Sequence, residues 1–203
     1  MKTIRRLLFV ILTVVSVFSA QAVETAEQVL QKCADKMKNA PSLSMQFDLN
    51  YGDNKSACDI TISREKYTLS SPELKIWYDG KSQWSYSSAD KEVTITEPTE
   101  EELLESNPFA LLTNYKRLFT FRRLSGNKND IELVAKNKMS TIRKAVVTID
   151  SKTSLPSKLI VTMSNGRTFS ATVKSAVTGK ALPNTTFTFN KSKYPTTTTI
   201  DLR

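Results

Sequence analysis

Few residues of this chain have the types and spacing that a catalytic site requires. The sequence contains no histidine, which removes the commonest general base, the usual base partner of serine and cysteine nucleophiles, and the commonest transition-metal ligand. Paired carboxylates could hydrolyse a glycosidic bond, but glutamates grouped at the start of a helix are more often a solvated face that the helix dipole favours. The glutamates in question are Glu97, Glu100, Glu101, Glu102 and Glu105. We therefore expect no catalytic residues, no metal, no cofactor, and a protein that is not an enzyme.

Two cysteines, Cys33 and Cys58, are the other reactive side chains. Their spacing fits neither a redox pair of the CxxC type nor a four-ligand zinc site. In an exported chain a disulfide between them would close a loop of about 25 residues and contribute roughly 3–4 kcal/mol to stability. Two buried free thiols are the alternative, and the sequence leaves both open.

The N-terminus predicts export. A basic start precedes an unbroken apolar run from Leu7 to Phe18, which is followed by the small-residue sequence Ala20-Gln21-Ala22. The run is about a dozen residues long, whereas a helix needs roughly 20 to span a bilayer. We expect a signal peptide over residues 1–22, cleavage after Ala22, and one globular domain over residues 23–203.

The charge of the chain is positive but dispersed. Removing Lys2, Arg5 and Arg6 with the signal peptide lowers the formal charge from +9 to +6. An exported chain without a basic-aromatic motif is a poor partner for nucleic acid, and this surplus suits solubility or weak attraction to anionic headgroups. We expect no nucleic-acid binding and transient contact with a membrane surface.

Hydrophobic periodicity predicts one helix followed by strands. The sequence Thr25-Ala26-Glu27-Gln28 has the form of a capping box, and apolar residues then recur at three-four spacing until Pro41 disfavours further helix. The pattern next alternates with period two, which predicts half-buried strands, with Asp79-Gly80 as a hairpin turn. These strands are expected at residues 45–51, 58–62, 67–69, 76–78, 83–86 and 93–95.

A helical interval then divides the strands. Glu100 to Glu102 form a first turn, and Asn107-Pro108 begins a second short helix, Phe109 to Leu112, with Asn as the cap and Pro at the first helical position. Strands resume at residues 119–124, 131–135, 145–149, 158–163, 168–173 and 185–189, and the polar tail from Tyr194 either adds a last edge strand or is frayed. The pattern predicts a mainly β (α+β) domain, with one large curved antiparallel sheet and helices on its concave face.

Three stretches resemble the LolA family of outer-membrane lipoprotein carriers. They are Asp79 to Tyr86, with an Asp-Gly-Lys turn before a Trp-x-Tyr strand, the pair Glu92-Val93, and Asn107 to Leu112, which opens Asn-Pro-Phe. Thr186-Phe187-Thr188-Phe189 is similar to the last core strand of the family. The order of signal peptide, helix, strands, helix and strands is also similar over nearly the whole mature chain.

The resemblance implies a half-open β-barrel that helices cover as a lid. It also implies a monomeric periplasmic chaperone without a cofactor, which accepts an acylated lipoprotein from an inner-membrane lipoprotein-releasing transporter and passes it to an outer-membrane acceptor. An alternative from another class is an adaptor of the cell envelope that uses the same fold to sense a lipid or peptide without transporting lipoproteins.

Site residues follow from the alternation and the resemblance together. We expect Phe109 and Leu112 on the lid, and the resemblance assigns Arg64 to the arginine that holds the lid by hydrogen bonds to its carbonyls. Here Glu65 follows that arginine, where the family has proline. The residues expected to line the lipid-binding cavity are Phe47, Leu49, Ile60, Ile62, Tyr67, Leu69, Trp84 and Tyr86.

Overall fold

The computed structural model describes residues 24–127 and 129–203, so the predicted signal peptide over residues 1–22 and its cleavage site lie outside the described residues. Helix α1 (Ala26–Asn39) opens the described chain. The Thr25 side chain accepts a hydrogen bond from the Gln28 N–H at 3.2 Å, and the Gln28 side chain accepts one from the Thr25 N–H at 2.8 Å. The predicted capping box and helix are therefore confirmed, and the helix ends just before Pro41.

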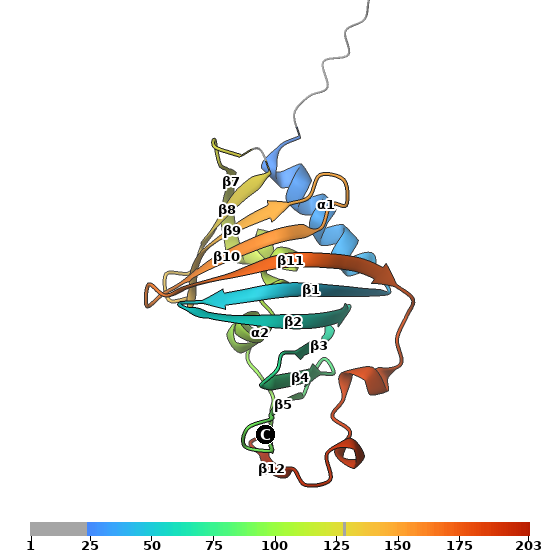
Figure 1. Cartoon of the computed structure of the whole chain (residues 1–203). Helices are drawn as coiled ribbons and strands as arrows, with labels where there is room; N and C mark the ends of the chain where they lie inside the picture. Colours follow the sequence, from blue (N-terminus) through green and yellow to red (C-terminus); the bar gives the residue numbers. More distant parts are fainter. Residues whose placement is uncertain (1–23, 128) are drawn as a thin grey trace, which may run out of the picture.

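The strands form one 12-stranded sheet, which Figure 1 shows as strongly curved. They are β1 (Ser42–Tyr51), β2 (Asn54–Ser63), β3 (Lys66–Ser70), β4 (Leu74–Tyr78), β5 (Gln83–Ser87), β6 (Glu92–Thr96), β7 (Phe119–Arg123), β8 (Asp130–Ala135), β9 (Ile142–Ile149), β10 (Pro156–Met163), β11 (Thr168–Gly179) and β12 (Thr198–Asp201). Their order across the sheet is β12-β6-β5-β4-β3-β2-β1-β11-β10-β9-β8-β7, so the two edge strands do not pair and the barrel stays open.

The sheet is mixed and not wholly antiparallel as predicted. Neighbouring strands are antiparallel except β12, which pairs with β6 in parallel. The hairpin turn at Asp79-Gly80 is confirmed: the Asp79 carboxylate accepts from the N–H groups of Lys81 and Ser82 at 2.9 and 2.8 Å, and Gly80 has a φ of 100° that suits glycine. Of the two alternatives for the polar tail, the structure has the edge strand, because β12 covers the exposed edge of β6.

Three short helices, α2 (Glu100–Ser106), α3 (Ala110–Thr113) and α4 (Tyr115–Leu118), connect β6 to β7. Helix α2 begins with a capping box between Thr99 and Glu102, and Glu100, Glu101 and Glu102 occupy its first turn. The prediction that Asn107 caps the next helix is wrong. Asn107 instead ends α2, where its N–H donates to the Leu103 carbonyl at 2.9 Å, and no side chain of the described residues caps α3.

The strand predicted at residues 185–189 is also wrong. This segment contains the 3₁₀ helix η1 (Asn184–Phe187), and a second one, η2 (Lys191–Lys193), follows before β12. Tertiary packing overrides the β propensity of the alternating Thr and Phe residues. The segment lies against β3 and β4, where Phe187 is 1% exposed, instead of adding a strand to the sheet.

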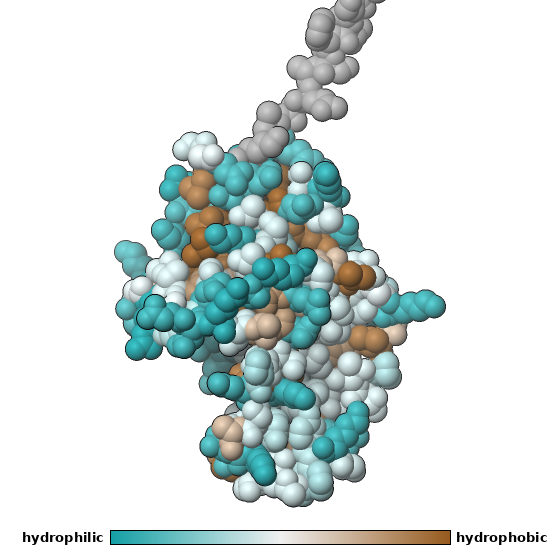
Figure 2. All heavy atoms as spheres, in the orientation of Figure 1, coloured by the Kyte–Doolittle hydropathy of each residue, from teal (hydrophilic) through white to brown (hydrophobic). Residues whose placement is uncertain are grey.

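The two faces of the sheet differ in chemistry. The concave face carries the apolar side chains of most strands and packs against α1 and the short helices, and this is the main core. The convex face carries ion pairs such as Asp48 between Lys55 and Lys174, both at 3.0 Å, and these lysines lower the pKa of Asp48. In the view of Figure 2, hydrophilic side chains surround smaller apolar patches. Among residues 24–127 and 129–203, no helix combines the length and apolarity that crossing a membrane demands.

Candidate functional site

A short apolar segment around α3 covers the concave face of the sheet. Phe109, Leu111 and Leu112 are all 0% exposed, and the Phe109 ring meets the Phe47 ring of β1 edge-on, with centroids 5.3 Å apart and an interplanar angle of 84°. Burial of such a side chain is worth roughly 1.5–3 kcal/mol. The structure thus brings the two residues predicted for the lid, Phe109 and Leu112, onto the predicted face. We call residues 100–118, which comprise α2, α3 and α4, the lid segment.

A polar network ties the lid segment to the sheet. The Tyr67 hydroxyl on β3 lies 2.6 Å from Ser106 Oγ at the end of α2 and 2.7 Å from Gln83 Oε1 on β5. The Ser106 hydroxyl also donates to the Glu102 carbonyl at 2.8 Å. Burial raises the pKa of Tyr67 to about 12, so its hydroxyl keeps its proton at neutral pH. Sequence reasoning missed Ser106 and Gln83, because nothing in their spacing indicates that β5 and α2 meet at Tyr67.

An exposed ion pair and a partly buried hydrogen bond hold α4, at the end of the lid segment. The Arg117 guanidinium of α4 makes two hydrogen bonds to the Glu100 carboxylate of α2, one of them 2.8 Å long. The Tyr115 hydroxyl donates to Gln31 Oε1 of α1 at 3.2 Å. Exposed ion pairs of this kind contribute about 0–1 kcal/mol, so they orient the lid segment more than they stabilise it.

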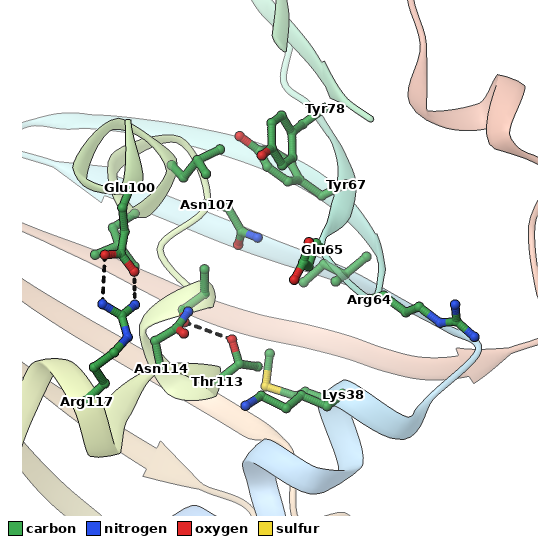
Figure 3. Close-up of a pocket in the computed structure, with 15 residues that line it drawn as sticks. Lys38, Arg64, Glu65, Tyr67, Tyr78, Glu100, Asn107, Thr113, Asn114 and Arg117 are labelled. Carbon is green, nitrogen blue, oxygen red and sulfur yellow. Dashed lines mark hydrogen bonds and ion pairs between the residues drawn. The ribbon is translucent and has the colours of Figure 1, made fainter. Parts of the chain in front are cut away.

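A pocket of about 640 Å³ opens beside the lid segment, and its residues are drawn in Figure 3. Its volume lies within the range of roughly 300–1,000 Å³ that is typical of sites for small molecules. The pocket is bounded by the end of α1, the turn between β2 and β3, and the lid segment. Its lining residues are Met37, Lys38, Ile62, Arg64, Glu65, Tyr67, Tyr78, Glu100, Leu103, Leu104, Asn107, Ala110, Thr113, Asn114 and Arg117.

The lining combines an apolar floor with polar groups. Ile62, Leu104 and Tyr67 are buried at the floor, whereas Lys38 and Glu65 bring charges to the mouth. Asn107 is 5% exposed, and its Oδ1 has no hydrogen-bond partner among the described residues. An arrangement of this kind can take up an amphiphile with an apolar chain and a polar linkage. In the part of the chain that the structure describes, no group of three His, Cys, Asp or Glu residues could hold a metal ion.

Six of the eight residues predicted to line a cavity lie on the concave face. Phe47, Ile60, Ile62 and Tyr67 are buried there, and the register of β1, β2 and β3 places the half-buried Leu49 and Leu69 on the same face. Ile62 and Tyr67 also line the pocket. Their role in lipid binding stays a prediction.

The other two predicted lining residues, Trp84 and Tyr86, point to the convex face. Ile76 and Tyr78 of β4 lie on the concave face, because they pair with Leu69 and Tyr67 of β3. Their partners on β5 are Ser85 and Gln83, so these two residues occupy the concave face of β5. Trp84 alternates with them and pairs with Trp77 and Ile95 on the opposite face. The Tyr86 ring packs against Tyr194 of the C-terminal segment, with centroids 4.7 Å apart. This part of the predicted lining is therefore wrong.

The structure also corrects the assignment of Arg64. This residue occupies the tight turn between β2 and β3 with a φ of 56°, and Figure 3 shows its side chain directed away from the lid segment. Among the described residues, no hydrogen bond joins Arg64 to the lid carbonyls. The polar contact that the structure does place between β3 and the lid segment joins the Tyr67 hydroxyl to Ser106 Oγ, which is a side-chain hydroxyl and not a backbone carbonyl.

Cys33 and Cys58 are both buried free thiols. Of the two alternatives that the sequence left open, the structure therefore has the free thiols and not the disulfide. Cys33 Sγ lies 3.9 Å from Met37 Sδ within α1, and burial raises the pKa of its thiol to about 12. Cys58 faces the core from β2, and burial together with the charges of Asp59 and Asp48 raises its pKa. Thiols in such surroundings are poor nucleophiles.

Known proteins resemble this chain in sequence pattern and in fold. A family model described as outer membrane lipoprotein carrier protein LolA matches residues 15–167, whereas no curated protein matches the sequence. An uncharacterized conserved protein from Thermus thermophilus superposes with a TM-score of 0.55 at 10% identity, over 87% of this chain and 98% of that one.

Two further structures superpose less closely. A LolA superfamily protein from Nitrosomonas europaea has a TM-score of 0.43 at 10% identity, over 82% of this chain and 98% of that one. A chain of the Pseudomonas aeruginosa MucA/MucB complex has a TM-score of 0.40 at 14% identity, over 80% of this chain and 60% of that one. Of these three structures, the Thermus thermophilus protein alone is similar enough to support the fold, and at 10% identity it says nothing about function.

Proposed function

Because this chain belongs to the LolA family of outer membrane lipoprotein carrier proteins, we propose that it is a periplasmic carrier that shields the acyl chains of lipoproteins from water. One observation carries the proposal: three wholly buried apolar side chains of the lid segment cover the concave face directly beside a pocket. The carrier domain would comprise residues 23–203, released by cleavage after Ala22.

The physical need for such a carrier is large. Each buried methylene is worth about 0.8 kcal/mol, so three acyl chains of some 16 carbons represent tens of kcal/mol against exposure to water. A lipoprotein therefore does not cross an aqueous compartment unaided at a useful rate. The concave face offers a continuous apolar surface, from Phe47 on β1 across Ile60 and Ile62 on β2 to Tyr67 on β3.

The lid segment also explains how such a carrier releases its cargo. Acyl chains that reach the concave face must displace Phe109, Leu111 and Leu112, which are fully buried against it. Exposing these side chains opposes the favourable burial of the acyl chains, so the net free energy of binding is smaller. Binding that is nearly balanced in this way allows transfer to an acceptor with slightly higher affinity. The carrier needs no catalytic group and no cofactor for this cycle, and we propose that it works as a monomer.

The partners follow from the family. We propose that an inner-membrane lipoprotein-releasing transporter loads the carrier and that an outer-membrane acceptor unloads it. The size of the pocket favours one alternative: about 640 Å³ suits a single small ligand, as an adaptor that senses one lipid or peptide would require.

Binding of an acylated lipoprotein, compared with the same protein after deacylation, tests the proposal. Gel filtration of the mature chain with each form should give a one-to-one complex with the acylated form alone. Equal binding of both forms, or of neither, would contradict a carrier for acyl chains.

Extraction of lipoprotein from membrane vesicles separates carrier from adaptor. The mature chain should release acylated lipoprotein into the supernatant, and an adaptor should not. Phe109→Glu places a carboxylate against Phe47 and should abolish extraction, whereas Phe109→Leu keeps an apolar lid and should retain it. Circular dichroism of both variants checks that they are folded.

A further inference from the structure

Asn107 has a buried polar side chain that the fold leaves without a partner. Its main chain is satisfied, because its N–H donates to the Leu103 carbonyl at 2.9 Å and its carbonyl accepts from the Ala110 N–H at 3.0 Å. Its side-chain Oδ1 has no hydrogen-bond partner among the described residues, although the residue is only 5% exposed. A buried acceptor without a donor is costly, and such a group in a native fold calls for an explanation.

The position of Asn107 connects this unmatched group to the pocket. It joins α2 to α3, two residues before Phe109, and Figure 3 shows its carboxamide directed into the pocket. Neighbouring polar side chains on the same wall are satisfied: Thr113 Oγ1 and Asn114 Nδ2 donate to the Ala110 carbonyl at 3.0 and 3.1 Å. Among the described residues, the Asn107 side chain therefore remains available on this wall for a ligand.

The chemistry of a carboxamide limits what it recognises. Its oxygen needs a donor and its NH₂ group needs an acceptor, which an amide supplies together through its N–H and its carbonyl. An ester linkage supplies acceptors only. The acyl chains of phospholipids are attached through esters, whereas a triacylated lipoprotein carries one chain on an amide and continues into peptide amides.

A carrier of lipoproteins must distinguish them from phospholipids, and the difference between an amide and an ester linkage makes this possible. An apolar face binds the chains of phospholipids and of lipoproteins alike, because the chains themselves are the same. A site that is built to hydrogen-bond one group rejects an analogue without that group strongly, since its own buried atom is then left unpaired. Discrimination therefore belongs at the linkage and not along the chain.

We propose that Asn107 is a specificity-determining residue that hydrogen-bonds the amide linkage at the start of an acylated lipoprotein. The proposal rests on the function proposed above and adds the chemical group by which cargo differs from bulk lipid. Asn107 lies at the α2–α3 junction, so the same movement of the lid segment that admits a chain brings the carboxamide to the ligand.

Two matched probes test the proposal: N-palmitoylglycine methyl ester and its ester analogue, methyl O-palmitoylglycolate, in which an oxygen replaces the amide N–H. Their affinities for the mature chain follow from displacement of a fluorescent fatty acid. The wild type should prefer the amide by roughly five- to 150-fold, which corresponds to one unmatched buried hydrogen-bonding group. Asn107→Leu should bind both probes equally and melt at or above the wild-type temperature, because the orphaned acceptor is gone.

The control variant is Asn114→Leu, which changes a paired carboxamide in the same pocket and should keep the preference for the amide. Equal affinity of the wild type for both probes, or a preference that persists in Asn107→Leu, would overturn the role of Asn107 and leave the carrier function standing. Failure of both probes to bind the wild type would overturn the carrier function as well.

Discussion

The hydroxyl of Tyr67 on β3 lies 2.6 Å from Ser106 Oγ at the end of α2. The bond joins the sheet to the lid segment from within the concave face, and Gln83 on β5 completes it at 2.7 Å from the same hydroxyl. Tyr67 is itself buried and lines the pocket, so removing its hydroxyl leaves Ser106 and Gln83 without one of their hydrogen-bond partners. Tyr67 is therefore the residue of the sheet that holds the lid segment in place, and we call its contact with Ser106 the latch.

Tyr67→Phe should loosen the lid segment without unfolding the domain. The change removes the buried Tyr67 hydroxyl from a partly buried network and should cost about 1–3 kcal/mol. Hydrogen exchange of the α2 and α3 amides, measured by mass spectrometry, should become faster while α1 stays protected. Tyr78→Phe is the matched control: its ring packs 5.5 Å from Tyr67, but no hydrogen bond of its hydroxyl is found among the described residues. Faster exchange of the lid in Arg64→Gly than in Tyr67→Phe would favour an arginine latch instead.

The stabilisation by Tyr67 should depend on pH in a defined window. Burial raises the pKa of Tyr67 from 10.0 to about 12, so the folded state favours the protonated phenol. That contribution is fully present below pH 10 and is lost as the pH rises toward 12. The difference in unfolding free energy between wild type and Tyr67→Phe, from urea titrations, should stay constant to about pH 10 and then shrink. A difference that already changes between about pH 6 and 9 would contradict the assignment.

The two thiols should be free but unreactive. Burial raises the pKa of the Cys33 thiol to about 12 and also raises the pKa of Cys58, so both stay protonated at neutral pH. Ellman's reagent should titrate close to two thiols per chain in denaturant without reductant, and almost none in the native protein. An absence of thiols in the denatured, unreduced sample would show that a disulfide forms in the exported protein.

The convex aromatic cluster should support stability and not lipid binding. Tyr194 contacts Trp77, Tyr86 and Phe189 with ring centroids 4.7–5.8 Å apart, and these residues lie away from the concave core. Truncation of a fully buried aromatic side chain to alanine costs about 3–5 kcal/mol. Tyr194 is partly exposed, so Tyr194→Ala should lower the free energy of unfolding by less than this. Affinity for a fluorescent fatty acid should be unchanged at temperatures where the variant is folded. A matching loss of affinity would place this cluster in the binding site.

Sequence patterns predicted the concave face well where strands follow one another through tight turns. Alternation on β1 continues into β2 and β3, and together with the family resemblance it predicted that Phe47, Ile60 and Tyr67 share one face, as the register shows. The same logic failed for Trp84 and Tyr86, because β5 has another layer on its convex side. That layer is the C-terminal segment, about 100 residues later in the chain, and no local pattern on β5 reveals it.

For a similar reason, the sequence predicts only part of the candidate site. Phe109 and Leu112 stand out as apolar residues of a short helix, which indicates that they cover something. Asn107 has the residue type of a helix cap, and its actual place depends on where α2 ends and how α3 tilts onto the sheet. The sequence motif drew attention to Asn107, but its unmatched side-chain oxygen is a property of the packed structure.

The most direct test of the carrier concerns the contact between Phe47 and Phe109, whose ring centroids are 5.3 Å apart. Nuclear Overhauser effects between their ring protons, in protein with labelled phenylalanine, should be strong without ligand. Saturation with a triacylated lipopeptide should abolish them, because the chains take the place of the Phe109 ring against Phe47. Undiminished effects in protein shown to have bound the lipopeptide would contradict a lid that acyl chains displace.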